Sequence, residues 1–196
     1  MIVLGVTGGL ASGKSSVSKY LQDKYKAYIF DADVEAKKIL HTKEVEKQIL
    51  EAFPQLKSLE TDLLSQAAFE NKQSQLKLNS IIHPLVEREI EQRIVNEDGK
   101  HPFFIIDAAM MIESGSVNYF RDKGMILLVV IADKAIRKER ALIRGNLLED
   151  SILERMNLQL PDSTKVKHAD FIVENNSTES ELFQKIDVII TKITNE

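Results

Sequence analysis

The sequence predicts an α/β protein in three layers, with a five-stranded parallel sheet flanked by helices. Five short apolar runs alternate with helical patterns along the chain, and they cover residues 2–7, 27–30, 102–106, 125–131 and 171–173. Runs of this length and composition are typical of parallel strands that are buried on both faces. Because crossovers between parallel strands carry helices and are right-handed, the alternation predicts helical layers around one sheet.

The length of the chain and the spacing of these strands predict one domain with two helical additions. The chain has 196 residues, of which 43% are hydrophobic and 29% are charged, as in an ordinary globular protein. We expect the core at about 1–33, 100–135 and 168–196, a helical lobe at about 34–99 and a lid at about 140–167. Within the lobe, Pro84 is expected to open a helix over 85–95, where its missing N–H does no harm.

Charge and composition exclude several kinds of partner. The net charge of −4 and the pI near 5.7 leave no general positive field, so nucleic-acid binding is not expected. The longest apolar run, residues 125–132, is far shorter than the roughly 20 residues that cross a bilayer. The chain has no cysteine and opens without a signal-peptide pattern. We therefore expect a cytoplasmic protein without a membrane partner, as a monomer or a weak homo-oligomer.

A glycine-rich loop follows the first strand and precedes a helix over residues 14–21. Gly8, four residues, Gly13, Lys14 and Ser15 match the phosphate-binding P-loop pattern in the strand–helix context that it requires. Phosphates approach the backbone N–H groups of such loops closely, and the helix N-terminus adds partial positive charge. The residues expected to bind ATP here are Gly8, Gly9, Ala11, Ser12, Gly13, Lys14, Ser15 and Ser16. The structural alternative is a turn that only caps the helix.

Carboxylates follow two of the predicted strands, at the sheet edge where open α/β proteins bind ligands. Ser15 and Asp107 are expected to hold Mg²⁺, because this cation prefers oxygen ligands and Asp107 ends a strand. Asp31 and Asp33 follow the second strand, and a single carboxylate suffices to cap the next helix. The other carboxylate can take the proton of an attacking hydroxyl, and we assign this role to Asp33. Helix capping explains Asp33 about as well, and it explains Asp107 nearly as well.

Three arginines lie at spacings of three and four residues in the helical pattern at 134–144. Arg137, Arg140 and Arg144 therefore share one face, and within this stripe only Asp133 stands one turn from any of them. The planar fork of arginine bonds phosphate and stabilises the charge that develops during phosphoryl transfer. We expect these arginines, Arg140 first among them, to bind an external anion. Residues 155–159 are expected to extend the cationic surface over the nucleotide as a lid.

The order and spacing of these segments resemble the dephospho-CoA kinase family nearly end to end. The matching segments are residues 7–16, 30–33, 81–86, 110–113, 140–144, 155–159 and 169–176. The resemblance implies a P-loop NTP hydrolase fold like that of nucleoside monophosphate kinases, with the lobe binding the acceptor. It also implies transfer of the γ-phosphate of ATP, with Mg²⁺, to the ribose 3′-hydroxyl of dephospho-CoA, the last step of coenzyme A synthesis. The catalytic residues would be Asp33, Lys14 and Arg140.

The same resemblance assigns residues to both substrates. Arg144 and Asn175 join the ATP site, and the residues placed at the acceptor are Thr7, Asp33, His83, Met110, Glu113 and Arg155. Taken alone, a residue such as His83 is more often a cap or a packed imidazole than a ligand, and core packing is the commoner role for Met110. Asn175 is also explained as a turn residue.

Three features depart from the family pattern. Ala109 stands where proline is usual, Thr61 stands where arginine is typical, and residues 54–60 look shortened. These departures concern the acceptor pocket rather than the use of ATP. The first alternative is another P-loop kinase, acting on a nucleoside monophosphate or a small alcohol. The second is a degenerate kinase that binds ATP in a regulatory role, against which the intact Lys14, Asp33 and Arg140 argue.

Overall fold

The structure is a computed structural model that describes residues 1–145 and 148–195, without the side chains of residues 61, 62, 65, 69 and 72. Its strands are β1 (Ile2–Gly8), β2 (Tyr28–Asp31), β3 (Phe103–Asp107), β4 (Ile126–Ile131) and β5 (Phe171–Glu174). Its helices are α1 (Lys14–Tyr25), α2 (Ala32–Leu40), α3 (Lys43–Ala52), α4 (Thr61–Phe69), α5 (Lys72–Glu97), α6 (Ser116–Arg121), α7 (Lys134–Ile143), α8 (Glu149–Leu158), α9 (Asp162–Lys165), the short 3₁₀ helix η1 (Val166–His168) and α10 (Glu179–Asn195). None of the helices in these ranges is long and apolar enough to pass through a bilayer.

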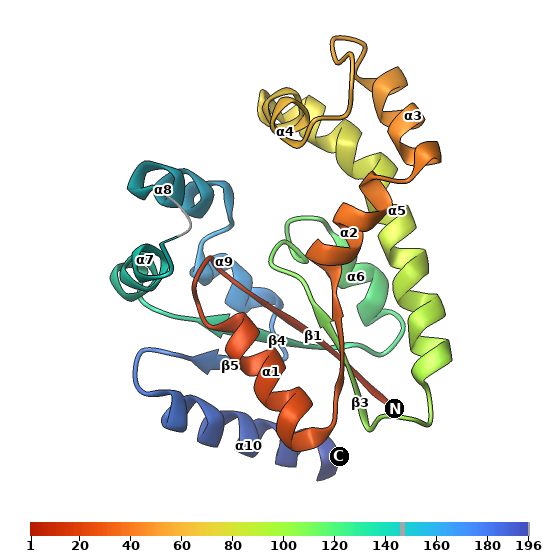
Figure 1. Cartoon of the computed structure of the whole chain (residues 1–196). Coiled ribbons are helices and arrows are strands. Elements are labelled where there is room, and N and C mark those ends of the chain that lie inside the picture. Colours follow the sequence, from red (N-terminus) through yellow and green to blue (C-terminus); the bar gives the residue numbers. More distant parts are fainter. Residues whose placement is uncertain (146–147, 196) are drawn as a thin grey trace. The chain divides into compact units, whose positions relative to one another are not determined.

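The five predicted strands form one parallel sheet in the order β2-β3-β1-β4-β5 (Figure 1). The central strand is β1, in which Val6 pairs with Asp107 of β3 and Gly8 pairs with Val130 of β4. The loop after β1 therefore begins where the strand order reverses, which is where open α/β sheets bind ligands. The predicted fold class is confirmed.

One face of this sheet packs against α1 and α10, which lie side by side (Figure 1). The buried residues of α10 recur with the spacing of one helix face, and they are Leu182, Ile186, Ile189, Ile190 and Ile193. They meet Leu4 and Val6 of β1 and Val17 and Leu21 of α1 in one hydrophobic cluster. This cluster fixes the direction in which α1 leaves the glycine-rich loop.

The chain divides into two compact units, Met1–Phe30 with Glu97–Glu196, and Asp31–Asn96. The second unit carries α2 to α4 and most of α5, which runs without a break and contains Pro84. The expectation that Pro84 opens a helix is therefore wrong. A proline inside a helix removes one backbone hydrogen bond, but Ile82, Val86 and Ile90 form a buried stripe on this helix, and packing overrides local preference. The side chain of Thr61 lies outside the described part.

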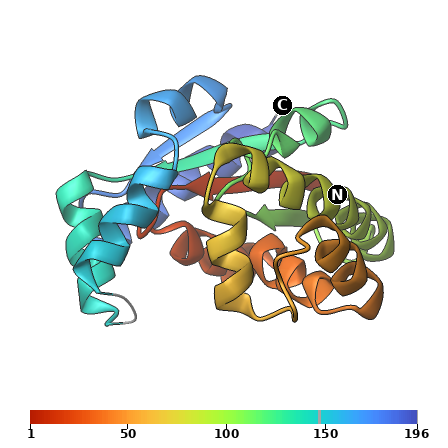
Figure 2. The same cartoon turned by 90° about the horizontal axis from the view of Figure 1, so that it is seen from above.

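Helices α7 and α8 belong to the first unit and lie side by side (Figures 1 and 2). Ala141 of α7 and the α8 residues Ile152 and Met156 form a small hydrophobic cluster with Leu10 and Ala11 of the glycine-rich loop. The helices of the expected lid therefore share buried surface with this loop. The expected range of the lid, 140–167, includes residues 146 and 147, which lie outside the described residues.

Candidate active site

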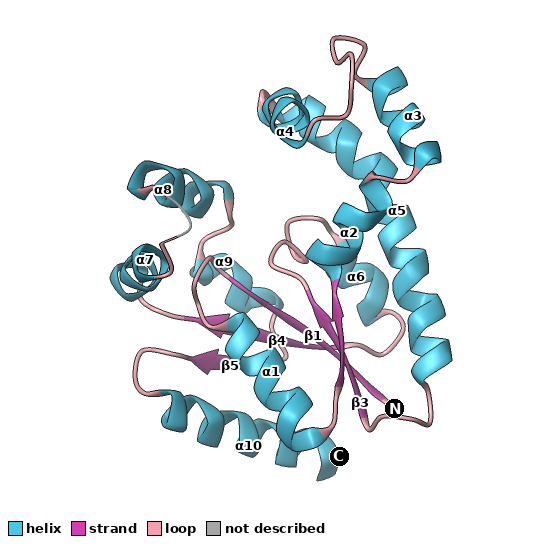
Figure 3. Cartoon of the chain, viewed as in Figure 1, coloured by secondary structure: helices cyan, strands magenta, loops and turns pink. Residues whose placement is uncertain are grey.

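The glycine-rich loop connects β1 to α1 (Figure 3), and its backbone is strained. Ala11 and Gly13 both lie in the left-handed region, with φ values of 58° and 103°. A residue with a side chain, such as Ala11, pays roughly 1 kcal/mol to adopt this conformation. Within the loop, the amide of Ser12 donates to the carbonyl of Gly9 at 3.0 Å. Strain of this kind persists only where surrounding contacts hold the backbone in place.

Asn175, which follows β5, fastens this loop to Arg140 of α7. Its side-chain amide donates to the carbonyl of Ser12 at 2.8 Å. Arg140 donates to the backbone carbonyl of Asn175 at 2.9 Å and to its side-chain oxygen at 3.4 Å. A Cβ on Gly13 would lie 2.1 Å from the amide nitrogen of Asn175. Gly13 is thus required by a contact within the protein, and not only by the approach of a phosphate.

A pocket of about 180 Å³ opens beside this network. Six of its lining residues belong to the predicted ATP site, namely Ala11, Gly13, Ser16, Arg140, Arg144 and Asn175. The rest of the wall comes from Ser177, Glu179 and Leu182 at the start of α10. Because the lining includes two arginines and the start of α1 against the single carboxylate of Glu179, the pocket suits an anionic ligand.

Lys14 and Asp107 form an ion pair at the carboxyl end of β3. Asp107 is only 4% exposed, and a buried carboxylate needs such a partner. Ser15, the next residue in α1, is exposed. Hydroxyl and carboxylate oxygens are donors that Mg²⁺ accepts, so Ser15 and Asp107 fit the expected metal role by donor type. In the described ranges no group of three or more acidic or histidine side chains could hold a metal, so phosphate oxygens would have to complete the coordination.

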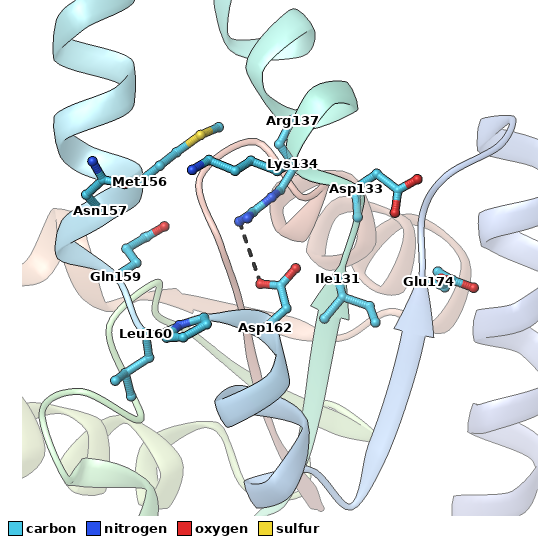
Figure 4. A pocket seen from close by; sticks show the side chains of 12 residues that line it. Ile131, Asp133, Lys134, Arg137, Met156, Asn157, Gln159, Leu160, Asp162 and Glu174 are labelled. Carbon is cyan, nitrogen blue, oxygen red and sulfur yellow. Dashed lines mark ion pairs between the residues drawn. The ribbon is translucent and has the colours of Figure 1, made fainter.

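The three arginines of α7 and its C-cap do not lie in one pocket. Arg140 and Arg144 line the pocket beside Asn175, whereas Arg137 pairs with Asp162 at the start of α9 (Figure 4). The helical pattern offers Arg137 only Asp133 as an acidic neighbour, whereas in the structure Asp162 pairs with it from outside the helix. Arg155, expected to contact the substrates, is exposed on α8.

The segment after α8 makes contacts that the local sequence pattern does not reveal. The side chain of Gln159 accepts a hydrogen bond from the amide of Leu10 at 2.7 Å. One carboxylate oxygen of Glu113 accepts from the amide of Leu160 at 3.0 Å and also pairs with Lys165, whose side chain is fully buried. Glu113, expected at the acceptor, is thus engaged within the protein through this oxygen. Lysines are rarely buried, and nothing near Lys165 in the sequence signals it.

Thr7 and Met110, also expected at the acceptor, lie at neighbouring strand ends. Thr7 is fully buried in β1, and its hydroxyl donates to the carbonyl of Ala109 at 3.2 Å. Since this bond uses the backbone of Ala109, the proline that is usual at this position would accept it equally. Met110 is half-buried in the turn after β3.

The second unit contains both candidate acids that follow β2, as well as His83. Asp31 is the N-cap of α2, where its carboxylate accepts from the amide of Val34 at 2.9 Å. Asp33 lies in the first turn of the same helix, which therefore does not need it as a cap. Burial lowers the pKa of His83 from its usual value of 6.5, against the opposing charge of Glu87, so its imidazole is neutral at neutral pH.

Loops of this construction bind the phosphates of nucleoside triphosphates. Arginines that reach such a loop are typical of enzymes that move the terminal phosphoryl group rather than only bind it. Together with the five-stranded parallel sheet, this arrangement defines a P-loop kinase.

Comparisons with known proteins identify the family. A family model described as dephospho-CoA kinase matches residues 2–181. A dephospho-CoA kinase from Fusobacterium nucleatum is 35% identical over 193 residues, which cover 95% of this chain and 96% of that protein. The solved dephospho-CoA kinase from Campylobacter jejuni is 25% identical, with a TM-score of 0.66 over 98% of this chain and 97% of that one. A solved structure from Thermus thermophilus shares the fold, with a TM-score of 0.82 at 23% identity over 97% of both chains. The chain belongs to the dephospho-CoA kinase family, whose members are ATP-dependent phosphotransferases.

The bridge made by Asn175 leads to a prediction about ATP affinity. Asn175→Ala removes the hydrogen bond to Ser12 and the side-chain contact with Arg140, so ATP affinity should fall about tenfold to a hundredfold. Asn176→Ala is the matched control, because Asn176 lies in the same turn but accepts from the amide of Asp133. ATP titration of both variants checks this, and equal losses in the two would contradict a specific role for Asn175.

Proposed function

We propose that this protein transfers the γ-phosphoryl group of ATP to the ribose 3′-hydroxyl of dephospho-CoA, releasing ADP and coenzyme A. The observation that carries the proposal is the bridge in which Asn175 holds Arg140 beside the glycine-rich loop. A phosphate-binding loop alone would serve any nucleotide-binding protein. An arginine fixed beside the loop places positive charge near the phosphoryl group, on which negative charge develops during transfer. This arrangement favours catalysis. The family match supports the identity of the acceptor.

In this proposal the loop and the start of α1 bind the phosphates of ATP. The backbone amides between Gly8 and Gly13 and the N-terminal turn of α1 face the negative charge. Lys14 exchanges Asp107 for the β- and γ-phosphates when ATP enters, because phosphate competes for the same ammonium group. Arg144 and Ser16 take part from the walls of the pocket.

Mg²⁺ is the cofactor that we propose to accompany ATP. Ser15 and Asp107 would hold it together with phosphate oxygens, since both offer the oxygen donors that this ion prefers. When bound, the ion neutralises negative charge on the phosphates during transfer. When ATP enters and Lys14 releases Asp107, the carboxylate of Asp107 would become available to bind Mg²⁺.

Asp33 acts as the general base in the proposed reaction. Its carboxylate takes the proton of the 3′-hydroxyl while the hydroxyl oxygen bonds to the γ-phosphorus and the bond from phosphorus to ADP breaks. Arg140 stabilises the charge on the transferred group. The capping role of Asp31 supports this assignment, because it accounts for one of the two acids without Asp33.

The remaining acceptor contacts are proposed from the family resemblance, and they are Thr7, His83, Met110, Glu113 and Arg155. The neutral imidazole of His83 can both donate and accept a hydrogen bond. The second carboxylate oxygen of Glu113 is buried and has no hydrogen-bond partner within the described ranges. A buried acceptor of this kind favours binding of a ligand hydroxyl or amide.

We also propose that the enzyme works in the cytoplasm, as a monomer or a weak homo-oligomer, without nucleic-acid partners. The net charge of −4 and the lack of cysteine support this setting.

The identity of the acceptor is tested by comparing substrates directly. With Mg-ATP, the purified protein should release ADP in step with the formation of 3′-phosphorylated product from dephospho-CoA. AMP, UMP and shikimate, offered separately in the same ADP-release assay, should turn over far more slowly. Faster turnover of one of these would overturn the acceptor assignment, and ATP binding without turnover of any acceptor would favour the regulatory alternative.

The assignment of the base is tested by a matched pair of substitutions in α2. Asp33→Asn should lower kcat by about a hundredfold or more while ATP affinity is kept, because only proton transfer is lost. Asp31→Asn is the control, since asparagine is also a good N-cap and the helix should stay intact. Steady-state rates and ATP titration of both variants decide the matter. If Asp31→Asn lost as much turnover as Asp33→Asn, the two roles would have to be reconsidered.

A further inference from the structure

Arg137 makes a contact with the glycine-rich loop that phosphate binding does not explain. A Cβ on Gly9 would lie 1.7 Å from Nη1 of Arg137 and 2.9 Å from its Cζ. The guanidinium group therefore occupies the space that a side chain at Gly9 would need. Gly9 falls among the four unspecified residues of the P-loop pattern, so the pattern does not demand a glycine there. The missing side chain makes room for Arg137.

Arg137 belongs to a partly buried ion pair of poor geometry. Its side chain is 12% exposed, that of Asp162 is 24% exposed, and Nη1 and Oδ1 are 3.6 Å apart, which is longer than a hydrogen bond. Within the described ranges, neither Nε of Arg137 nor Oδ1 of Asp162 has a hydrogen-bond partner. A loose pair that is still partly exposed to solvent contributes little to stability. The ion pair between Arg137 and Asp162 therefore adds little to the stability of the fold. Its presence is better explained by a role in function.

The segment that supplies Asp162 also holds the next residue of the loop. Gln159 accepts from the amide of Leu10 at 2.7 Å, one residue beyond Gly9. Figure 4 shows Arg137 and Asp162 pointing toward one another across a pocket that Gln159 also lines, with the arginine coming from α7. Two consecutive residues of the loop are thus held by side chains around this pocket.

This second pocket has a volume of about 530 Å³ and shares no lining residue with the pocket beside Asn175. Arg140 and Arg137, one helical turn apart on α7, therefore reach the same loop from two different pockets. Arg140 is linked to Ser12 through Asn175, whereas the guanidinium group of Arg137 lies directly beside Gly9.

We propose that Arg137 is a positioning residue for ATP binding. Held by Asp162, its guanidinium group fixes the backbone at Gly9 in the shape that receives the phosphates and adds positive charge behind the loop. The proposal rests on the proposed function only in the use of ATP, and the identity of the acceptor plays no part in it. It assigns Asp162 the task of orienting Arg137.

A double-mutant cycle between Gly9 and Arg137 tests the proposal. Affinity for a non-hydrolysable ATP analogue is titrated without acceptor in the parent, Gly9→Ala, Arg137→Ala and the double variant. Each single change should weaken binding about tenfold, because the new methyl group displaces the same guanidinium group that Arg137→Ala removes. In the Arg137→Ala background, Gly9→Ala should add less than about twofold. Equal losses from Gly9→Ala in both backgrounds would overturn the proposal.

Three further measurements separate positioning from a merely structural role. Asp162→Asn keeps the shape of the side chain and should weaken analogue binding in the parent but not in the Arg137→Ala background. Lys134→Ala is the matched control, because Lys134 lines the same pocket one turn away and is not placed at the loop. Melting temperatures are recorded for all variants, and a fall in melting temperature with unchanged analogue affinity would refute the proposal. Turnover of dephospho-CoA is measured separately, so failure of the acceptor assignment leaves the affinity result unaffected.

Discussion

The structure depends on a strained loop that the rest of the chain must hold in shape. Ala11 and Gly13 take left-handed backbone conformations two residues apart, and both lie between β1 and α1. The contacts that hold the loop come from the C-terminal third of the chain, through Asn175 after β5, Gln159 after α8 and Arg137 on α7. In the proposed function, these tertiary contacts shape the backbone that receives the phosphates.

This dependence links the loop to the part of the molecule expected to close over the nucleotide. Leu10 and Ala11 share a hydrophobic cluster with residues of α7 and α8. Because this cluster is closely packed, a shift of these helices would displace the backbone of the loop. Helix α7 also carries Arg140, which Asn175 links to Ser12. In the proposed mechanism, binding of the phosphates and placement of Arg140 therefore depend on the same set of contacts.

The fold could be predicted because the sequence patterns that indicate it are local. Much of the site could not be predicted, because it is formed by residues that lie far apart in the sequence. Buried parallel strands leave unbroken apolar runs, and the P-loop pattern marks one strand–helix junction. Pro84 was misplaced because a buried stripe on α5 outweighs the local cost of proline. Local spacing could not show that Asp162 would reach Arg137 or that Lys165 would be buried beside Glu113, since these partners lie far apart in the sequence. The sequence does not show which of Asp31 and Asp33 caps α2. In the structure Asp31 is the cap, because its carboxylate accepts from the amide of Val34.

Amide hydrogen exchange of the unaltered protein, recorded without nucleotide, tests the central claim most directly. If the loop is held by the protein itself, the amides of Leu10 and Ser12, which donate to Gln159 and Gly9, should be clearly protected in the absence of ATP. Exchange of these amides at the rate of an unstructured peptide, with protection appearing only after ATP is added, would show that the nucleotide shapes the loop and would contradict the account.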